Sequence, residues 1–203
     1  MTIKPIASID REIAIYHFRG LLQSLGYAWR GEPGMNAVAS GKDTAERAVD
    51  AYLEFFAQHQ DYVNFTTFPA DGTTGMIAVT QIEFASMCVH HFLPYVGVAH
   101  VCYIPGKLIC GLSKIVRVVM HYAHRPSVQE DLTSKIATFM WEQLKPKGVG
   151  VMIEAQHACI AIRGVCKPRH WTITCDTRGC FEESTVKNEF LSLIRGARGT
   201  QGA

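Results

Sequence analysis

The sequence predicts an α+β fold, in which strands and helices occupy different stretches of the chain. Two amphipathic helical patterns come first. After residue 75 the expected order is strand, strand, helix, helix, strand, strand, and segment 149–162 has the long alternation of β-branched residues that is typical of a strand. A chain of 203 residues accommodates one such domain with a helical extension, and would bury roughly 70% of its unfolded surface.

The N-terminal part is predicted to form two helices. Residues 11–25 have an apolar helical face, which consists of Ala14, Phe18, Leu21, Leu22 and Leu25, and Gly26 follows as a stop. The loop-like segment 27–41 separates this helix from a second one, expected from about residue 43 to about residue 59. We interpret residues 1–75 as a helical extension, 76–196 as the catalytic domain and 197–203 as a flexible tail.

The predicted domain contains four strands and three helices. The expected strands cover residues 76–84, 95–104, 149–162 and 171–175. The expected helices begin at Ser113, Ser127 and Ser184, and the last of them ends near Ile194. The sequence has no internal repeat and no low-complexity segment.

The composition is that of an ordinary globular protein. Hydrophobic residues make up 48% of the chain, charged residues 19%, and the formal net charge is +2. This balance argues against a nucleic-acid binder that relies on a basic surface, and no apolar run is long enough to span a membrane. The first ten residues lack the apolar core of a signal peptide, and seven cysteines form no regular framework. We therefore expect a cytoplasmic protein with reduced thiols.

A set of cysteines and histidines predicts a zinc site. Cys88 and His91 are three positions apart, and Cys159 lies 71 residues beyond Cys88. Three such ligands suit Zn²⁺ and leave a fourth position for water or substrate, as in hydrolytic sites. His90 and His157 remain beside the metal as candidate proton carriers, since imidazole titrates near neutral pH. The ordinary alternatives are a chance pair in a turn and a surface histidine at position 90.

In an extended strand 149–162, residues of equal parity would point to the same face. His157, Cys159 and Arg163 share that parity, so the strand would aim a proton carrier, a metal ligand and a cation in one direction. The alternative for this segment alone is a buried cysteine beside a hydrogen-bonded core histidine. The Cys88/His91 pair favours zinc.

Two helix starts carry polar groups. Ser113, Lys114 and Arg117 would place a hydroxyl and two cations where backbone N–H groups and the helix dipole favour anions, although capped helices with basic faces are common. Ser127 and Glu130 have the spacing of a capping box, which predicts that Glu130 reaches back to the Ser127 backbone. The functional alternative for Glu130 is a carboxylate that accepts two N–H bonds from a purine edge.

Taken together, these segments resemble the GTP cyclohydrolase I family from about Thr80 to Arg195. The ordered matches are Cys88-Val89-His90-His91-Phe92-Leu93-Pro94, Tyr103-Ile104-Pro105, Gly111-Leu112-Ser113-Lys114, Arg125-Pro126, Gln129-Glu130, Ala155-Gln156-His157-Ala158-Cys159, Arg163-Gly164 and Glu189-Phe190-Leu191. The resemblance implies the tunnelling fold, an antiparallel β-sheet with helices packed on one face. It also implies a homo-oligomer of rings that pair into decamers, with sites built from more than one chain.

The resemblance implies a role for each matched residue. The zinc ligands would be Cys88, His91 and Cys159, and the proton carriers His90 and His157, with Ser113 assisting near the ribose. Gln129 and Glu130 would read the guanine edge. The triphosphate would be bound by Lys114, Arg117, Arg163 and, less securely matched, Arg47. The implied reaction opens the imidazole ring of GTP, expels C8 as formate and yields 7,8-dihydroneopterin triphosphate.

The chain departs from the family pattern at several positions. Val89 stands where the family usually has glutamate, Ala45 where proline is usual, Ser127 where glutamine is common, Asp131 where arginine is common, and His170 where a small hydroxyl residue is usual. Val89 removes a polar neighbour of the metal ligands. These departures leave two alternatives open: a divergent cyclohydrolase that acts on another purine nucleotide, and a non-catalytic zinc-stabilised nucleotide-binding protein.

Overall fold

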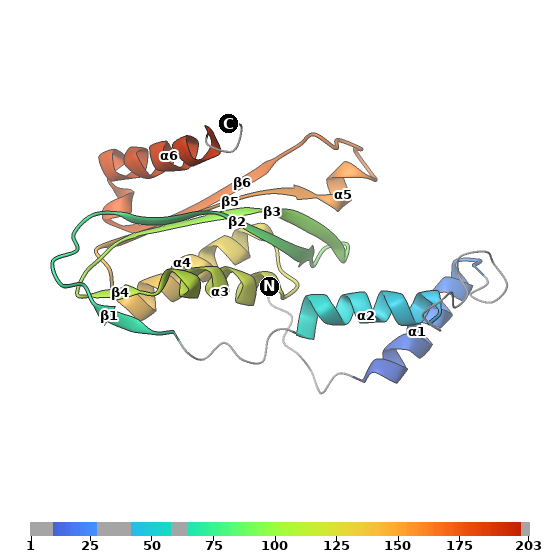
Figure 1. The fold of residues 1–203 in the computed structure, drawn as a ribbon. Coiled ribbons are helices and arrows are strands. Elements are labelled where there is room, and N and C mark those ends of the chain that lie inside the picture. The colour runs from blue at the N-terminus through green and yellow to red at the C-terminus, as the bar shows by residue number, and fades with distance from the viewer. Residues whose placement is uncertain (1–9, 28–41, 58–64, 200–203) are drawn as a thin grey trace. The chain divides into compact units, whose positions relative to one another are not determined.

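The computed structural model describes residues 10–27, 42–57 and 65–199. These residues form two compact units (Figure 1). The first contains α1 (Arg11–Ser24) and α2 (Thr44–Ala57), and the second contains every element from residue 67 onward. None of the described helices combines the length and the apolar character needed to cross a bilayer.

Both N-terminal helices are confirmed. The α1 helix ends at Ser24, one residue before the expected end, and α2 begins at Thr44 and is described to Ala57, so the last two residues of the prediction lie outside the described residues. A small apolar core of Ile15, Ala45 and Val49 joins the two helices.

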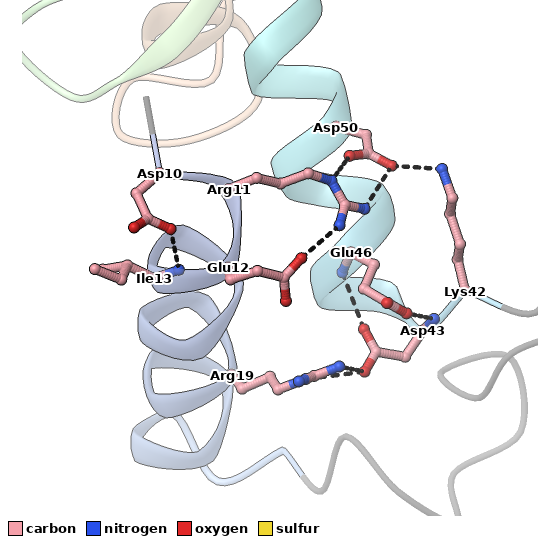
Figure 2. A network of polar contacts seen from close by, with 9 residues as sticks. All are labelled: Asp10, Arg11, Glu12, Ile13, Arg19, Lys42, Asp43, Glu46 and Asp50. Atoms are coloured by element: carbon pink, nitrogen blue, oxygen red, sulfur yellow. Dashed lines mark hydrogen bonds and ion pairs between the residues drawn. The ribbon is translucent and has the colours of Figure 1, made fainter. Parts of the chain in front are cut away.

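Charged side chains add a second set of contacts between α1 and α2 (Figure 2). Asp43 and Glu46 form a reciprocal capping box, with N···O distances of 2.9 and 2.6 Å. Arg19 binds the same Asp43 carboxylate at 2.6 Å. Arg11 reaches Asp50 with two N–H donors, which holds the pKa of the Asp50 carboxyl well below its usual range. The start of α2 is therefore fixed both by its own cap and by α1.

The second unit is built on a four-stranded antiparallel sheet in the order β2-β3-β5-β6. Its strands are β2 (Ile77–Cys88), β3 (Leu93–Ile104), β5 (Gly148–His157) and β6 (Thr172–Gly179). The short strands β1 (Thr67–Pro69) and β4 (Leu108–Cys110), which the sequence analysis did not find, form a separate two-stranded sheet.

Helices cover both faces of the main sheet. The elements are α3 (Leu112–Ala123), α4 (Gln129–Leu144), α5 (Ala158–Ala161), the 3-10 turn η1 (Cys180–Glu182) and α6 (Ser184–Gly199). Helices α3 and α4 lie together on one face, and α6 lies on the opposite side (Figure 1). The predicted α+β fold class is thus confirmed, and the structure adds α6 as a helix on the second face.

The alternation of β5 explains why the sheet is covered on both faces. Its odd-numbered residues, Val149, Val151, Ile153 and Ala155, are fully buried in the core shared with α3 and α4. The even-numbered Met152 packs instead in the smaller core formed with Phe181, Phe190 and Ile194. His157 has the odd parity and therefore faces the α4 side.

Several element boundaries differ from the predictions. The strand expected at 76–84 continues to Cys88, so the first metal-ligand candidate ends a strand. The strand expected at 149–162 ends at His157, and α5 follows at once. The closing helix α6 extends to Gly199, five residues past Ile194. Three residues of the expected tail are therefore helical, and residues 200–203 lie outside the described residues.

Candidate active site

One end of the main sheet gathers most of the chemically active side chains. Tyr95 on β3 lies opposite His157 on β5, and Cys88 is the last residue of β2. The four-residue turn 89–92 connects Cys88 to β3 and is closed by a hydrogen bond from the Phe92 amide to the Cys88 carbonyl, at 2.9 Å. The beginning of α4, at Gln129, reaches the same end of the sheet.

The short helix α5 places the second cysteine. Because β5 ends at His157, Cys159 lies in α5 and Arg163 follows that helix. The prediction that His157, Cys159 and Arg163 share one face of a single strand is therefore wrong. The change from strand to helix turns the chain at a corner, and this corner brings Cys159 toward Cys88 at the end of β2.

The two cysteine thiols lie close together. Burial is the largest cause of the raised pKa of Cys159, and the charge and a hydrogen bond of Cys88 raise that pKa further. The nearby Arg163 guanidinium acts in the opposite direction. Cys88 itself is buried, with 4% of its surface exposed. Two adjacent thiols beside a cation form a suitable pair of ligands for a soft or borderline metal ion.

The predicted third zinc ligand, His91, lies in the turn after Cys88. In the part of the chain that the structure describes, no three His, Cys, Asp or Glu side chains form a ready metal-binding group. His90 Nδ1 lies 3.7 Å from Cys88 Sγ, and both His90 and His91 are exposed in this turn. The thiols therefore fit the predicted site, and both histidines belong to the turn that follows Cys88.

His157 is held by three different contacts. Its ring stacks on Tyr95, with a centroid separation of 4.6 Å and an interplanar angle of 4°. Its Nε2 atom lies 2.8 Å from Gln129 Oε1, and its backbone N–H donates to His170 Nε2 at 3.1 Å. Burial lowers the pKa of His157, and the charge of His170 adds to this effect, while that of Glu130 opposes it. The imidazole is thus fixed in plane and in position.

Gln129 has a role that the sequence analysis did not foresee. Its side chain is 1% exposed, and its amide nitrogen lies within 3.1 Å of Ile153 O, Thr172 O and Thr174 Oγ1. Because the amide oxygen contacts His157, protein groups occupy both ends of the amide. The base-reading role implied for Gln129 does not fit this arrangement, because the amide has no N–H left for a ligand.

The capping box predicted at Ser127 and Glu130 is also wrong. Helix α4 begins at Gln129, its N-cap is Val128, and no side chain caps it. Ser127 is buried, and its hydroxyl lies 3.1 Å from the Tyr95 hydroxyl. The serine therefore supports the ring that stacks on His157, and Glu130 is left exposed in the first turn of the helix.

Comparison with known proteins shows to which family the chain belongs. A family model described as GTP cyclohydrolase I matches residues 32–195 of the chain. The chain belongs to the GTP cyclohydrolase I family. It is therefore an enzyme of that class, as the sequence predicted.

Curated relatives match most of the chain. GTP cyclohydrolase 1 from Aquifex aeolicus (strain VF5) is 46% identical over 157 residues, which are 76% of this chain and 84% of that protein. The protein of the same name from Geobacillus sp. (strain WCH70) is 44% identical over 192 residues, which are 93% of this chain and 98% of that protein. GTP cyclohydrolase 1 from Hydrogenobaculum sp. (strain Y04AAS1) is 45% identical over 162 residues, 76% of this chain and 85% of that protein.

Within this GTP cyclohydrolase I fold, the predicted phosphate ligands do not all lie at one place. Arg163 is near Cys159, at the corner described above. Ser113 and Lys114 are in the first turn of α3, which directly follows Cys110. The Cys110 amide donates to the Tyr103 hydroxyl at 3.3 Å, and Tyr103 is eight residues along β3 from Tyr95. At about 3.4 Å per residue, those two tyrosine backbones are roughly 27 Å apart.

The remaining predicted phosphate ligands are Arg117 and Arg47. Arg117 is exposed one turn further along α3. Arg47 belongs to the first unit, where its guanidinium donates to the Lys42 carbonyl at 2.5 Å and to Thr44 Oγ1 at 3.3 Å. One described unit of the chain therefore does not collect the full predicted set of phosphate ligands around His157.

His170 is the residue of this GTP cyclohydrolase I site that sequence reasoning placed least well. It was noted only as a departure from the family pattern. In the structure its Nδ1 lies 2.7 Å from the Lys167 carbonyl, and its Nε2 accepts the His157 N–H. In the neutral form of His170, these contacts place the ring hydrogen on Nδ1. His170 thus ties the loop after α5 to the backbone of His157.

Proposed function

We propose that this chain hydrolyses GTP at C8 of the purine, releases formate and forms 7,8-dihydroneopterin triphosphate. The observation that carries the proposal is the corner at the end of β5, where paired thiols lie beside a buried, firmly positioned histidine. Family membership supports the same activity, since the relatives named above are GTP cyclohydrolases.

We assign Cys88, Cys159 and His91 as the residues that hold a zinc ion. Two thiols and an imidazole match the preference of Zn²⁺, and three protein ligands leave one position open. When bound there, the ion supplies an acidified water, because zinc lowers the pKa of water from about 15.7 toward 7. The nearby Arg163 guanidinium lowers the pKa of Cys159 and so favours the thiolate form that binds a metal ion.

Two histidines have separate proton-transfer roles in this proposal. His157 donates a proton to N7 of the purine, which makes C8 more electrophilic. His90, exposed in the turn 89–92, donates to the ribose ring oxygen so that the sugar can open and rearrange. Positioned general acids of this kind contribute roughly 100- to 10,000-fold to a rate. Ser113 is assigned to assist near the ribose.

Release of formate from GTP is the test of this function. Purified holoenzyme should release one formate for each GTP consumed and form a fluorescent pterin after oxidation. ATP, which lacks the guanine amide edge, serves as the control nucleotide. If another purine nucleotide releases formate and GTP does not, that nucleotide is the substrate in place of GTP. If no purine nucleotide releases formate, the protein is not a cyclohydrolase.

Glu130 is assigned as the reader of the guanine edge. Its carboxylate is exposed at the start of α4, and its charge is close enough to raise the pKa of His157. Glu130→Gln presents an NH₂ group where guanine N–H donors need an acceptor, so GTP affinity should fall by roughly 10- to 100-fold, since a hydrogen bond to a charged group contributes about 1.5–3 kcal/mol.

Melting temperature and GTP affinity separate binding from stability at this position. Because Glu130 does not cap α4, Glu130→Gln should melt within about 1 °C of the parent, since exposed substitutions usually change stability by less than about 0.5 kcal/mol. Glu142→Gln, exposed near the end of the same helix, is the matched control. Normal GTP affinity in Glu130→Gln would remove this residue from the base site.

We further propose that the active sites are shared between copies of the chain in a ring-based oligomer, a decamer by analogy with the family. Lys114 lies in the first turn of α3, beside one end of β3, whereas His157 lies opposite Tyr95 at the other end. One copy would then supply the zinc and His157, and its neighbour Lys114, Arg117 and Ser113.

A complementation experiment tests this shared site. Cys159→Ser and Lys114→Ala should each be inactive alone, yet mixed rings should regain partial activity, because some sites receive an intact contribution from each neighbour. The mixture is made by co-expression, and native mass spectrometry verifies mixed assembly. A mixture of two variants at the same end, Cys159→Ser with Cys88→Ser, is the control and should stay inactive. Proven mixed rings without rescue in the first pair would place both residues in one site of one chain.

A further inference from the structure

The orientation of the Gln129 amide is fixed by its surroundings. Two of the three acceptors near its nitrogen are the backbone carbonyls of Ile153 and Thr172, at 3.1 and 3.0 Å. Carbonyl oxygens accept hydrogen bonds and cannot donate them. The NH₂ group must therefore face these carbonyls, and the amide oxygen must face the other way, toward His157.

This orientation determines which nitrogen of His157 carries a hydrogen. Gln129 Oε1 lies 2.8 Å from His157 Nε2 and can only accept, so Nε2 must donate. In a neutral imidazole the other nitrogen, Nδ1, then has the lone pair. Among the described residues, the structure records no hydrogen-bond partner for Nδ1.

The other contacts of His157 hold the imidazole ring in this orientation. The parallel stack on Tyr95 holds the imidazole plane, and Ser127 holds the Tyr95 hydroxyl. His170 holds the backbone N–H of His157. Within that plane, a half-turn of the ring would exchange Nε2 for a carbon and lose the Gln129 bond. The Gln129 bond therefore selects one of two ring orientations as well as one tautomer.

We propose that Gln129 is a positioning residue that holds His157 as the Nε2–H tautomer and leaves Nδ1 as the nitrogen that serves the substrate. The inference rests on the proposed function. Nδ1 first takes up a proton from water, which makes the ring an imidazolium with hydrogens on both nitrogens. In the forward step this proton passes from Nδ1 to N7 of the purine, and the electron pair of the broken N–H bond stays on Nδ1. His157 is left as the neutral Nε2–H form, the form that Gln129 holds. No atom of Gln129 is required to contact the nucleotide.

The threonine hydroxyls near Gln129 also support a positioning role. Thr133 Oγ1 donates to the Gln129 backbone carbonyl at 2.8 Å and lies 2.6 Å from Thr174 Oγ1, which in turn contacts the Gln129 amide. Strands β5 and β6 and helix α4 therefore all contribute to the orientation of one side chain. Hydrogen-bonded supports of this kind fix the tautomer and direction of a functional histidine.

Neutron diffraction on the deuterium-exchanged holoenzyme tests the tautomer directly, whether or not the protein turns over GTP. Deuterium should appear on Nε2 of His157 and on the Gln129 nitrogen that faces Ile153 and Thr172. Deuterium on Nδ1 alone, or a Gln129 oxygen directed at those carbonyls, would overturn the proposal. If the protein released no formate from GTP, the proposed function would fail while this measurement would still stand.

Kinetics of Gln129→Met separate positioning from base reading. The variant keeps the side-chain length but loses both hydrogen-bonding ends. We expect kcat for GTP to fall about 100-fold, within the usual range for general acid–base catalysis, with KM within about twofold of the parent. The ratio of kcat/KM for GTP over inosine triphosphate, which lacks the 2-amino group, should not change. A raised KM with lost discrimination would make Gln129 a base reader and overturn the proposal.

Two further substitutions keep this test decisive. Gln143→Met, exposed near the end of α4, is the matched control for the same chemical change. If Gln129→Met fails to fold, Thr174→Val removes one acceptor of the Gln129 amide, and Thr174→Ser restores the hydroxyl. Because the Ile153 and Thr172 carbonyls still hold the amide, we expect a fall in kcat well below 100-fold in the valine variant and recovery in the serine variant, both with unchanged KM. Full activity in Thr174→Val, with Gln129 turned away from His157 in its structure, would overturn the proposal.

Discussion

Cys159→Ser should lose most of its zinc and essentially all of its formate release. We expect about one tightly held Zn²⁺ per chain in the parent, since three protein ligands with two thiolates bind zinc firmly. A serine hydroxyl at position 159 is a harder and far less acidic ligand than a thiolate, so the zinc affinity should collapse. Elemental analysis after gel filtration measures the metal, and the formate assay measures the activity.

The control for this substitution lies in the same part of the chain. Cys166→Ser changes an exposed cysteine in the loop after α5 and should keep full zinc content and activity. A Cys159→Ser protein with one zinc per chain would remove Cys159 from the ligand set and with it the central element of the proposed site.

The same analysis decides between the two histidines of the turn. His91→Ala should lose zinc, whereas His90→Ala should retain it and lose rate instead. The outcome is of interest because His90, not His91, approaches the Cys88 thiol in the described structure. Zinc loss in His90→Ala with zinc retained in His91→Ala would exchange their assignments.

His157→Ala should retain zinc and lose roughly 100- to 10,000-fold in kcat, the usual contribution of a positioned general acid or base. The substitution removes the ring between Tyr95 and Gln129 without touching either cysteine. His17→Ala, exposed on α1, controls for the loss of a histidine elsewhere in the chain. Joint loss of metal and activity in His157→Ala would show that His157 is a ligand or a support of the metal site.

The sequence predicts much of the fold because its local patterns agree with the tertiary structure. The alternation along β5 continues through the buried odd positions, and His157 lies on the same face of the strand. The same alternation does not show where the strand ends. Residues 158–161 contain neither glycine nor proline, and α5 is a single turn whose position depends on packing rather than on a local stop signal.

The contacts that hold His157 could not be derived from local patterns. The spacing of Ser127 and Glu130 is a good capping box, but Tyr95, 32 residues away in sequence, takes the serine hydroxyl instead. Gln129 finds its partners on β5 and β6, at separations of 24 to 45 residues. His170 stood out only as a departure from the family pattern, and its bond to His157 spans a loop. A single sequence contains no record of such pairings.

The separation of the two ends of β3 has a consequence for mixed populations of chains. Suppose that each site is built from residues of two neighbouring chains. A chain that is faulty at both ends then inactivates two sites, whereas a chain that is faulty at one end inactivates one. In cells that make intact chains and chains faulty at both ends, activity would then fall as the square of the intact fraction. Such a double variant would be partly dominant in a genetic cross, although the intact gene still produces intact chains.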